Sequence, residues 1–258
     1  MNLFVLLKTV PDTVEELTVA ADEKSLDTEW LRYKLSDSDE HALEQALLLK
    51  EKHGGTVTVV AIDAPEMDDT LFTALAKGAD RAVKLAGELG AVRSFGVARL
   101  FADFLKGPGG AVPADTLILL RGQAIDDLDG EIGPFLAGLL GLPYVSVVTG
   151  VALEGAVVTA LKEFSGGLRG EFTAPLPAIL GIQSAEKPPR YVPIAKVRAA
   201  AKTAKLETVD APAPDAPARY EVEKLYRPVV AGKAQMLEGS PEEVADRLAQ
   251  LLAEQSLI

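Results

Sequence analysis

The segment TLILLRGQAIDDLDGEIGPFLAGLLGLP, residues 116–143, leads from an apolar strand through an acidic turn into an apolar helix. The run TLILL has the length of a buried strand, and the apolar pattern resumes as a helix after Gly130. Repeated units of this strand–turn–helix kind predict a parallel sheet with helices on both faces.

Similar units precede this segment along the chain. The run NLFVLL, residues 2–7, ends in a Pro-Asp turn and predicts a strand buried on both faces. The stretch SDSDEHALEQALLLKEKHGG has Ser and Asp at a helix cap, a helical apolar repeat and Gly54 as a stop. Further strands are predicted at residues 56–62 and 81–85, further helices at about residues 68–77 and 95–105, and a hairpin excursion from Leu17.

The pattern changes after Pro143. YVSVV predicts one more strand, and the following segment, residues 156–182, has the short strands and the Ser-Gly-Gly turn of antiparallel hairpins. From Lys187 the chain becomes basic and interrupted by prolines, and residues 210–220 are too poor in large apolar groups to pack a core.

The last segment, SPEEVADRLAQLLAEQ, predicts an amphipathic helix beyond this linker. Ser240 is its cap, Pro241 occupies the first helical position and Glu243 completes a capping box. We therefore divide the chain into an α/β domain at residues 1–185, a basic segment at residues 186–209, and a linker with a C-terminal arm at residues 210–258.

Composition narrows the function. The 258 residues carry a net charge of -12, which argues against a nucleic-acid partner, and the absence of cysteine excludes disulfides and a thiol nucleophile. The N-terminal apolar run is six residues long, too short for a signal segment or a membrane span. We expect a soluble, cytoplasmic protein without membrane insertion.

The turn after residue 120 is placed to bind a ligand. Open parallel sheets bind ligands at the carboxyl ends of their strands, and Gly130 and Gly133 would let the backbone and the free N–H groups of a helix approach a phosphate. The turn's acids are Asp126, Asp127, Asp129 and Glu131, which would either repel a phosphate or serve only to stabilise the helix N-terminus. Lys8, after the first strand, would either meet a phosphate or be the polar end of that strand.

Catalytic groups are scarce. The two histidines, His41 and His53, both lie on one predicted helix, and we interpret them as helix surface residues. The Asp126/Asp127 pair could chelate Mg²⁺ or act as acid and base, although adjacent side chains point in different directions. We predict no catalytic residue and no metal site.

A set of motifs carries a resemblance along nearly the whole chain. The motifs, in order, are LLKTVPDT, SDSDEHALEQALLLKE, TALAKGADRAVKL, LILLRGQAIDDLDGEIGPFLAGLLGLP, KEFSGGL, LPAIL and PPRYVPIAKV. Together they resemble the β subunit of electron transfer flavoprotein. The resemblance implies a doubly wound, mainly parallel α/β sheet of the adenine-nucleotide-binding type, with a C-terminal antiparallel excursion and an extended arm.

The resemblance also implies a role. A partner α subunit would hold most of the FAD, and this subunit would keep a structural AMP and perform no bond-making chemistry of its own. Electrons would arrive from acyl-CoA and related dehydrogenases and leave to a membrane quinone reductase. An ATP-pyrophosphate-cleaving ligase would need a Ser/Gly-rich loop after the first strand, and a universal-stress-type nucleotide sensor would lack the basic segment and the arm.

The family's nucleotide pocket can be carried over by position. Together with Lys8, the expected cofactor-binding residues are Leu6, Ser36, Asp63, Gln123, Ala124, Ile125, Asp126, Gly130, Glu131, Ile132 and Gly133. Many AMP-binding members have Asn, Gln and Thr where this chain has Gly130, Glu131 and Ile132, so phosphate recognition would depend on backbone N–H groups. Ser36 likewise replaces a frequent Asn.

A second branch of the family is the alternative. Its members bind FAD in this pocket and bifurcate electrons from NADH, and they often show VPDT, as at residues 10–13, and an aliphatic-Gly-Pro like residues 132–134. Some family members place aromatic rings beside the partner's flavin where this chain has Thr13 and Ser38.

The basic segment resembles the family's partner-recognition loop. The resemblance implies that Ile194 inserts into a pocket on the dehydrogenase, with Val197 one turn later if the segment is helical. Nearby Lys196, Arg198 and Lys202 would steer an acidic partner. The alternative is a solvated basic helix at the edge of the sheet. The linker and the last helix would dock on the α subunit.

Overall fold

The computed structural model describes residues 1–90, 92–126, 130–216, 221–228, 232, 234 and 236–258. In this part of the chain nine strands form one sheet in the order β11-β5-β4-β1-β6-β10-β7-β8-β9, and β2 and β3 pair separately. The strands are β1 (Asn2–Leu7), β2 (Thr9–Pro11), β3 (Tyr33–Leu35), β4 (Thr56–Ile62), β5 (Arg81–Ala86), β6 (Thr116–Arg121), β7 (Tyr144–Glu154), β8 (Val157–Glu163), β9 (Arg169–Pro175), β10 (Ala178–Ile182) and β11 (Glu207–Asp210). The helices are α1 (Asp37–His53), α2 (Met67–Lys77), α3 (Ser94–Lys106), α4 (Ile132–Leu140), α5 (Ile194–Thr203) and α6 (Pro241–Glu254).

The centre of the sheet is parallel and buried on both faces. Strand β1 lies between β4 and β6, with Leu6 opposite both Val60 and Leu120. Helices α1 and α2 pack on the face that contains Leu3 and Val5, and α3 and α4 pack on the opposite face. Because both faces are covered, these strands are continuous apolar runs rather than alternating ones. The predicted doubly wound, mainly parallel α/β fold is confirmed.

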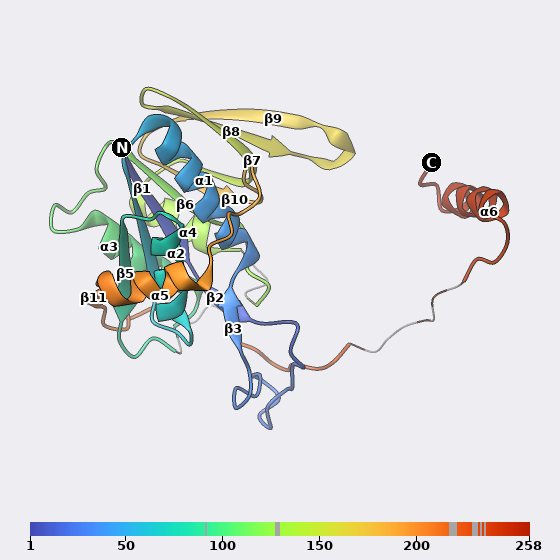
Figure 1. The fold of residues 1–258 in the computed structure, drawn as a ribbon, viewed down its shortest axis with the longest axis horizontal. Coiled ribbons are helices and arrows are strands. Elements are labelled where there is room, and N and C mark those ends of the chain that lie inside the picture. The colour runs from blue at the N-terminus through green and yellow to red at the C-terminus, as the bar shows by residue number, and fades with distance from the viewer. Residues whose placement is uncertain (91, 127–129, 217–220, 229–231, 233, 235) are drawn as a thin grey trace.

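The antiparallel hairpin after β7 is also confirmed, and Figure 1 shows β8 and β9 extending as a long ribbon beyond the helices. Strand β10, however, does not continue this hairpin. It returns to the middle of the sheet and runs parallel to β6 on one side and β7 on the other. The sequence pattern predicted another short hairpin strand at this position, and that prediction was wrong.

Two further segments differ from the sequence-based expectation. The excursion after Leu17 contains an isolated antiparallel bridge between Val19 and Leu26 instead of a regular hairpin. Residues 207–210, where no strand was predicted, form β11 at the edge of the sheet, parallel to β5. The excursion is enclosed by the short β2–β3 pair, which brings its two ends together.

The C-terminal arm carries the predicted helix. Ser240 accepts a hydrogen bond from the backbone of Glu243, whose side chain accepts one from the backbone of Ser240, so the expected capping box is present. In Figure 1, α6 lies well apart from the sheet. None of the helices that the structure describes combines the length and the apolar character needed to cross a bilayer.

Candidate functional site

The candidate site lies where β1 and β6 end side by side. The chain leaves β1 through α1 toward β4 on one side, whereas β6 lies on the other side of β1. A topological switch of this kind opens a crevice beyond the carboxyl ends of the two strands, which is where open α/β sheets bind their ligands.

A buried carboxylate holds the two strand ends together. Asp39, in the first turn of α1, is 0% exposed. Its Oδ2 accepts a hydrogen bond from the backbone N–H of Lys8, 2.9 Å away, and its Oδ1 accepts one from the backbone N–H of Arg121 at 3.1 Å. The Arg121 guanidinium donates to Oδ2 at 3.2 Å. One side chain thereby fixes the exits of β1 and β6.

The first hollow at this edge is a cavity of about 380 Å³. Four of the expected site residues line it, namely Lys8, Asp63, Asp126 and Ile132. The Lys8 ammonium contacts the Asp126 carboxylate at 2.5 Å, and Lys84 lies 3.4 Å from the carboxylate of Asp63. These pairs offset the acidic charge that would otherwise oppose an anionic ligand.

A second hollow of about 560 Å³ lies beside the same turn. It is lined by four other expected residues, Gln123, Ala124, Ile125 and Gly130. Ser38 also lines it and donates a hydrogen bond to the carbonyl of Gln123, 3.3 Å away. The turn that begins at residue 121 is therefore a common wall of the two hollows, because Arg121 and Asp126 face the first one.

The remaining expected residues line neither hollow. Leu6 is a core residue beneath the site, and Ser36 is buried at the N-cap of α1, where its side chain makes no capping hydrogen bond. Its backbone N–H donates to the carbonyl of Lys8 instead. Gly133 packs against Tyr144, since a Cβ there would lie 2.5 Å from the Tyr144 ring.

Of the acids in the turn, Asp126 and Glu131 are described by the structure. Glu131 occupies the N-cap position without a capping hydrogen bond from its side chain, and Asp126 pairs with Lys8. Asp127 and Asp129 lie outside the described residues. Among those that are described, no group of three or more His, Asp and Glu side chains is arranged to hold a metal ion.

Sequence reasoning missed three contributors to this site. Asp39 was not among the expected site residues, although an acid three residues after a cap can face inward. Arg93 and Ser94, at the start of α3, line the first cavity, but they follow no recognisable motif. Their place is set by the sheet order, which brings the segment after β5 beside β4.

The expected partner-binding residues lie away from both hollows. Ile194 begins α5 and is 65% exposed, and Val197 is half-buried in the same helix. The predicted helical spacing is thus present, with the two side chains one turn apart. Helix α5 packs against α2, beside the face of the sheet that α1 covers.

Comparison with known proteins finds similar sequences in one family, that of electron transfer flavoprotein. The family described as electron transfer flavoprotein domain matches residues 25–214. The electron transfer flavoprotein subunit beta of Bacillus subtilis is 29% identical over 100% of both chains. That of Clostridium acetobutylicum is 33% identical over 81% of this chain and 79% of its own, and the mitochondrial one of Oryza sativa subsp. japonica is 31% identical over 96% and 97%.

Replacing Asp39 by alanine removes the acceptor of two backbone amides and one buried guanidinium. We expect this change to lower the free energy of unfolding by about 3–5 kcal/mol at neutral pH. Asp37→Ala in the same turn is the control, because its exposed carboxylate pairs with the exposed Lys34 and should contribute less than about 1 kcal/mol. Urea unfolding measures both values, and equal losses would contradict the role of Asp39.

The pH dependence of stability gives a second test of the same residue. Burial raises the pKa of Asp39 to about 6, while Arg121 and the two amides favour its charged form. Because the pKa in the unfolded chain is lower, at roughly 3.9, the stability contributed by this group is present below about pH 4 and is lost as the pH rises through 6. The difference in unfolding free energy between the protein and Asp39→Asn should fall by roughly 3 kcal/mol from about pH 4 to about pH 7. A constant difference across this window would contradict the raised pKa.

Proposed function

Because this chain belongs to the electron transfer flavoprotein family as a β subunit, we propose that it binds AMP as a structural nucleotide and helps to enclose the FAD of an α subunit. Membership gives the chain an electron-transfer role beside an α subunit, and β subunits of this family are carriers rather than enzymes. In our proposal the heterodimer is cytoplasmic and carries electrons from acyl-CoA and related dehydrogenases toward a membrane quinone reductase.

The observation that carries the AMP proposal is the cavity of about 380 Å³ beyond β1, β4 and β6. Its volume lies at the lower end of the range of ligand pockets, roughly 300–1,000 Å³, which suits a nucleoside monophosphate. Lys8, Asp63, Asp126 and Ile132 would surround this nucleotide. Backbone N–H groups near Asp126 and Ile132, which line the same cavity, would hold its phosphate in place of the Asn, Gln and Thr side chains of relatives. Leu6, Ser36 and Gly133 would shape the pocket from beneath.

The division of the site into two hollows favours AMP over FAD in this subunit. FAD contains an AMP moiety joined to a second phosphate, a ribityl chain and a three-ring flavin, so it would have to extend from the first hollow toward the second. The common wall that begins at residue 121 stands between them. We therefore assign the second hollow, with Ser38, Gln123, Ala124, Ile125 and Gly130, to the enclosure of the α subunit's flavin.

The nucleotide content of the heterodimer tests this assignment. We expect denaturation to release about one AMP and one FAD per heterodimer, identified by mass spectrometry after co-purification with the α subunit. Two FAD molecules and no AMP would instead establish the bifurcating form and predict NADH oxidation. Absence of any nucleotide bound to this subunit would contradict the assigned pocket.

The three segments of the chain take different tasks in this proposal. Residues 1–185 bind the nucleotide, residues 186–209 meet the dehydrogenase, and residues 210–258 reach the α subunit. The exposed side chain of Ile194 at the start of α5 is suited to fill a partner's pocket, while Val197 supports it from the next turn. The exposed basic residues Lys196 and Arg198 would steer an acidic partner surface.

Placing a charge at the tip of α5 tests the docking proposal. Ile194→Asp should lower kcat/KM for reduction of the heterodimer by an acyl-CoA dehydrogenase on the order of 30-fold, as expected for an apolar interface hot spot. Leu168→Asp is a matched control, since Leu168 is 68% exposed on the distant β8–β9 hairpin and Ile194 is 65% exposed. Stopped-flow reduction of the flavin gives both values, and similar losses in the two variants would contradict a specific role for Ile194.

A further inference from the structure

The chain between β10 and α5 is held by side chains of α1. The backbone N–H of Ala185 donates to His41 Nδ1 at 3.2 Å, and that of Glu186 donates to Gln45 Oε1 at 3.1 Å. The backbone N–H of Arg190 donates to the carboxylate of Glu44 at 3.0 Å. Positions 41, 44 and 45 share one face of a helix, so this face forms a continuous support for the segment.

Arg190 makes the strongest of these contacts. Its Nε lies 2.9 Å and its terminal NH2 2.8 Å from the two oxygens of Glu44, and NH1 lies 2.6 Å from the carboxylate of Glu51. The Glu44 side chain is 4% exposed and therefore lies beneath the guanidinium rather than at the surface. A two-pronged contact of this kind fixes the orientation of both groups, which a single charge on a flexible lysine would not do.

The position of Arg190 in the chain gives this contact its meaning. It stands four residues before Ile194, and the prolines at positions 188, 189 and 193 restrict the backbone on both sides of it. Tyr191, the next residue, is 86% exposed, so Arg190 is the last of these contacts with α1 before the chain reaches α5.

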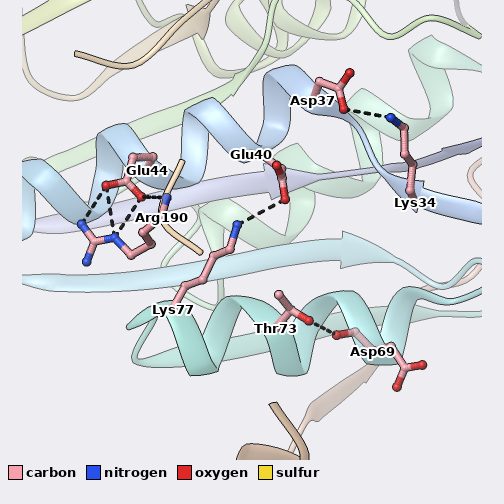
Figure 2. Close-up of polar contacts among 8 residues, drawn as sticks. All are labelled: Lys34, Asp37, Glu40, Glu44, Asp69, Thr73, Lys77 and Arg190. Carbon is pink, nitrogen blue, oxygen red and sulfur yellow. Dashed lines mark hydrogen bonds and ion pairs between the residues drawn. The ribbon is translucent and has the colours of Figure 1, made fainter. Parts of the chain in front are cut away.

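Helix α5, at the other end of the segment, is also connected to α1, through α2. Helix α5 packs against α2, and Lys77 of α2 reaches Glu40 of α1 at 3.2 Å. The Lys77 side chain is 6% exposed, whereas that of Glu40 is 40% exposed, so only the lysine side of this ion pair is buried. Figure 2 shows both contacts: Glu40 of α1 pairs with Lys77, and Glu44, one turn further along α1, pairs with Arg190.

We propose that Arg190 is a positioning residue for partner docking, which it serves by holding the base of the recognition segment against Glu44 and Glu51 so that Ile194 is presented in one orientation. This inference rests on the proposed docking function of Ile194. A segment that is ordered before it meets its partner loses less conformational entropy on binding. The smaller entropy cost makes the binding free energy more favourable. Arg190 acts through Ile194, and Glu44 acts through Arg190 from a buried position.

Steady-state reduction of the co-purified heterodimer by a purified acyl-CoA dehydrogenase tests the proposal. We expect Arg190→Gln and Glu44→Gln each to raise the KM for the heterodimer about tenfold, with kcat nearly unchanged, because the ordering cost affects association rather than electron transfer in the bound state. Arg190→Lys, which keeps the charge and loses the fork, should fall between these variants and the original protein. Arg169→Gln is the control, since it breaks the exposed Arg169–Glu163 pair on the distant β8–β9 hairpin and should leave KM unchanged.

A double-mutant comparison separates positioning from general loss of stability. If Arg190 orders Ile194, Ile194→Ala should raise KM less in the Arg190→Gln background than in the original protein. Purely additive effects, or an unchanged KM in both Arg190→Gln and Glu44→Gln, would overturn the inference while the docking role of Ile194 stood. If Ile194→Asp itself leaves KM unchanged, the proposed docking function fails, and the inference that rests on it fails too. Flavin absorbance and the thermal midpoint of each heterodimer verify that the variants are assembled. If the Arg190→Gln heterodimer does not assemble, the milder Arg190→Lys variant still tests the proposal.

Discussion

The structure depends on the buried carboxylate of Asp39, which is surrounded by hydrogen-bond donors. Asp39 accepts hydrogen bonds from the backbone N–H groups of Lys8 and Arg121, at the ends of β1 and β6, together with one from the Arg121 guanidinium. A buried charge is tolerated only when it is paired and hydrogen-bonded. The same contacts fix Lys8 and Arg121, which both line the cavity, so the fold and the candidate pocket share a single constraint.

Helix α1, which contains Asp39, also contacts the sheet and the segment that leads to α5. Its first turn fixes the strand ends, its apolar face covers the sheet, and its outer polar face supports the segment that leads to α5. A long helix that is apolar on one side can serve both purposes because residues three and four apart share a face. The candidate nucleotide pocket and the candidate docking segment are therefore built on the same rigid element.

The sequence predicted the parallel core because runs such as NLFVLL and TLILL are apolar at every position, as strands buried on both faces must be. It did not predict the place of β10, since the run AILGI looks like one more hairpin strand until its burial between β6 and β7 is known. It also missed β11, which has the polar sequence ETVD and depends on pairing with β5. Lys8 and Asp126 were predicted as site residues, but their mutual contact was not, because it joins positions far apart in the chain. Asp39 was missed for a similar reason: a helix-start acid looks the same in sequence whether it faces water or the core.

The ribbon formed by β8 and β9 leaves the long side of β9 as an outer edge of the sheet. Such an edge exposes unpaired backbone groups that invite another strand to join, and proteins discourage this with charges and proline. Strand β9 carries Arg169 and Glu171 and ends at Pro175, and Arg169 pairs with Glu163 of β8. These residues disfavour edge-to-edge association between copies of the chain, which directs assembly to its other surfaces.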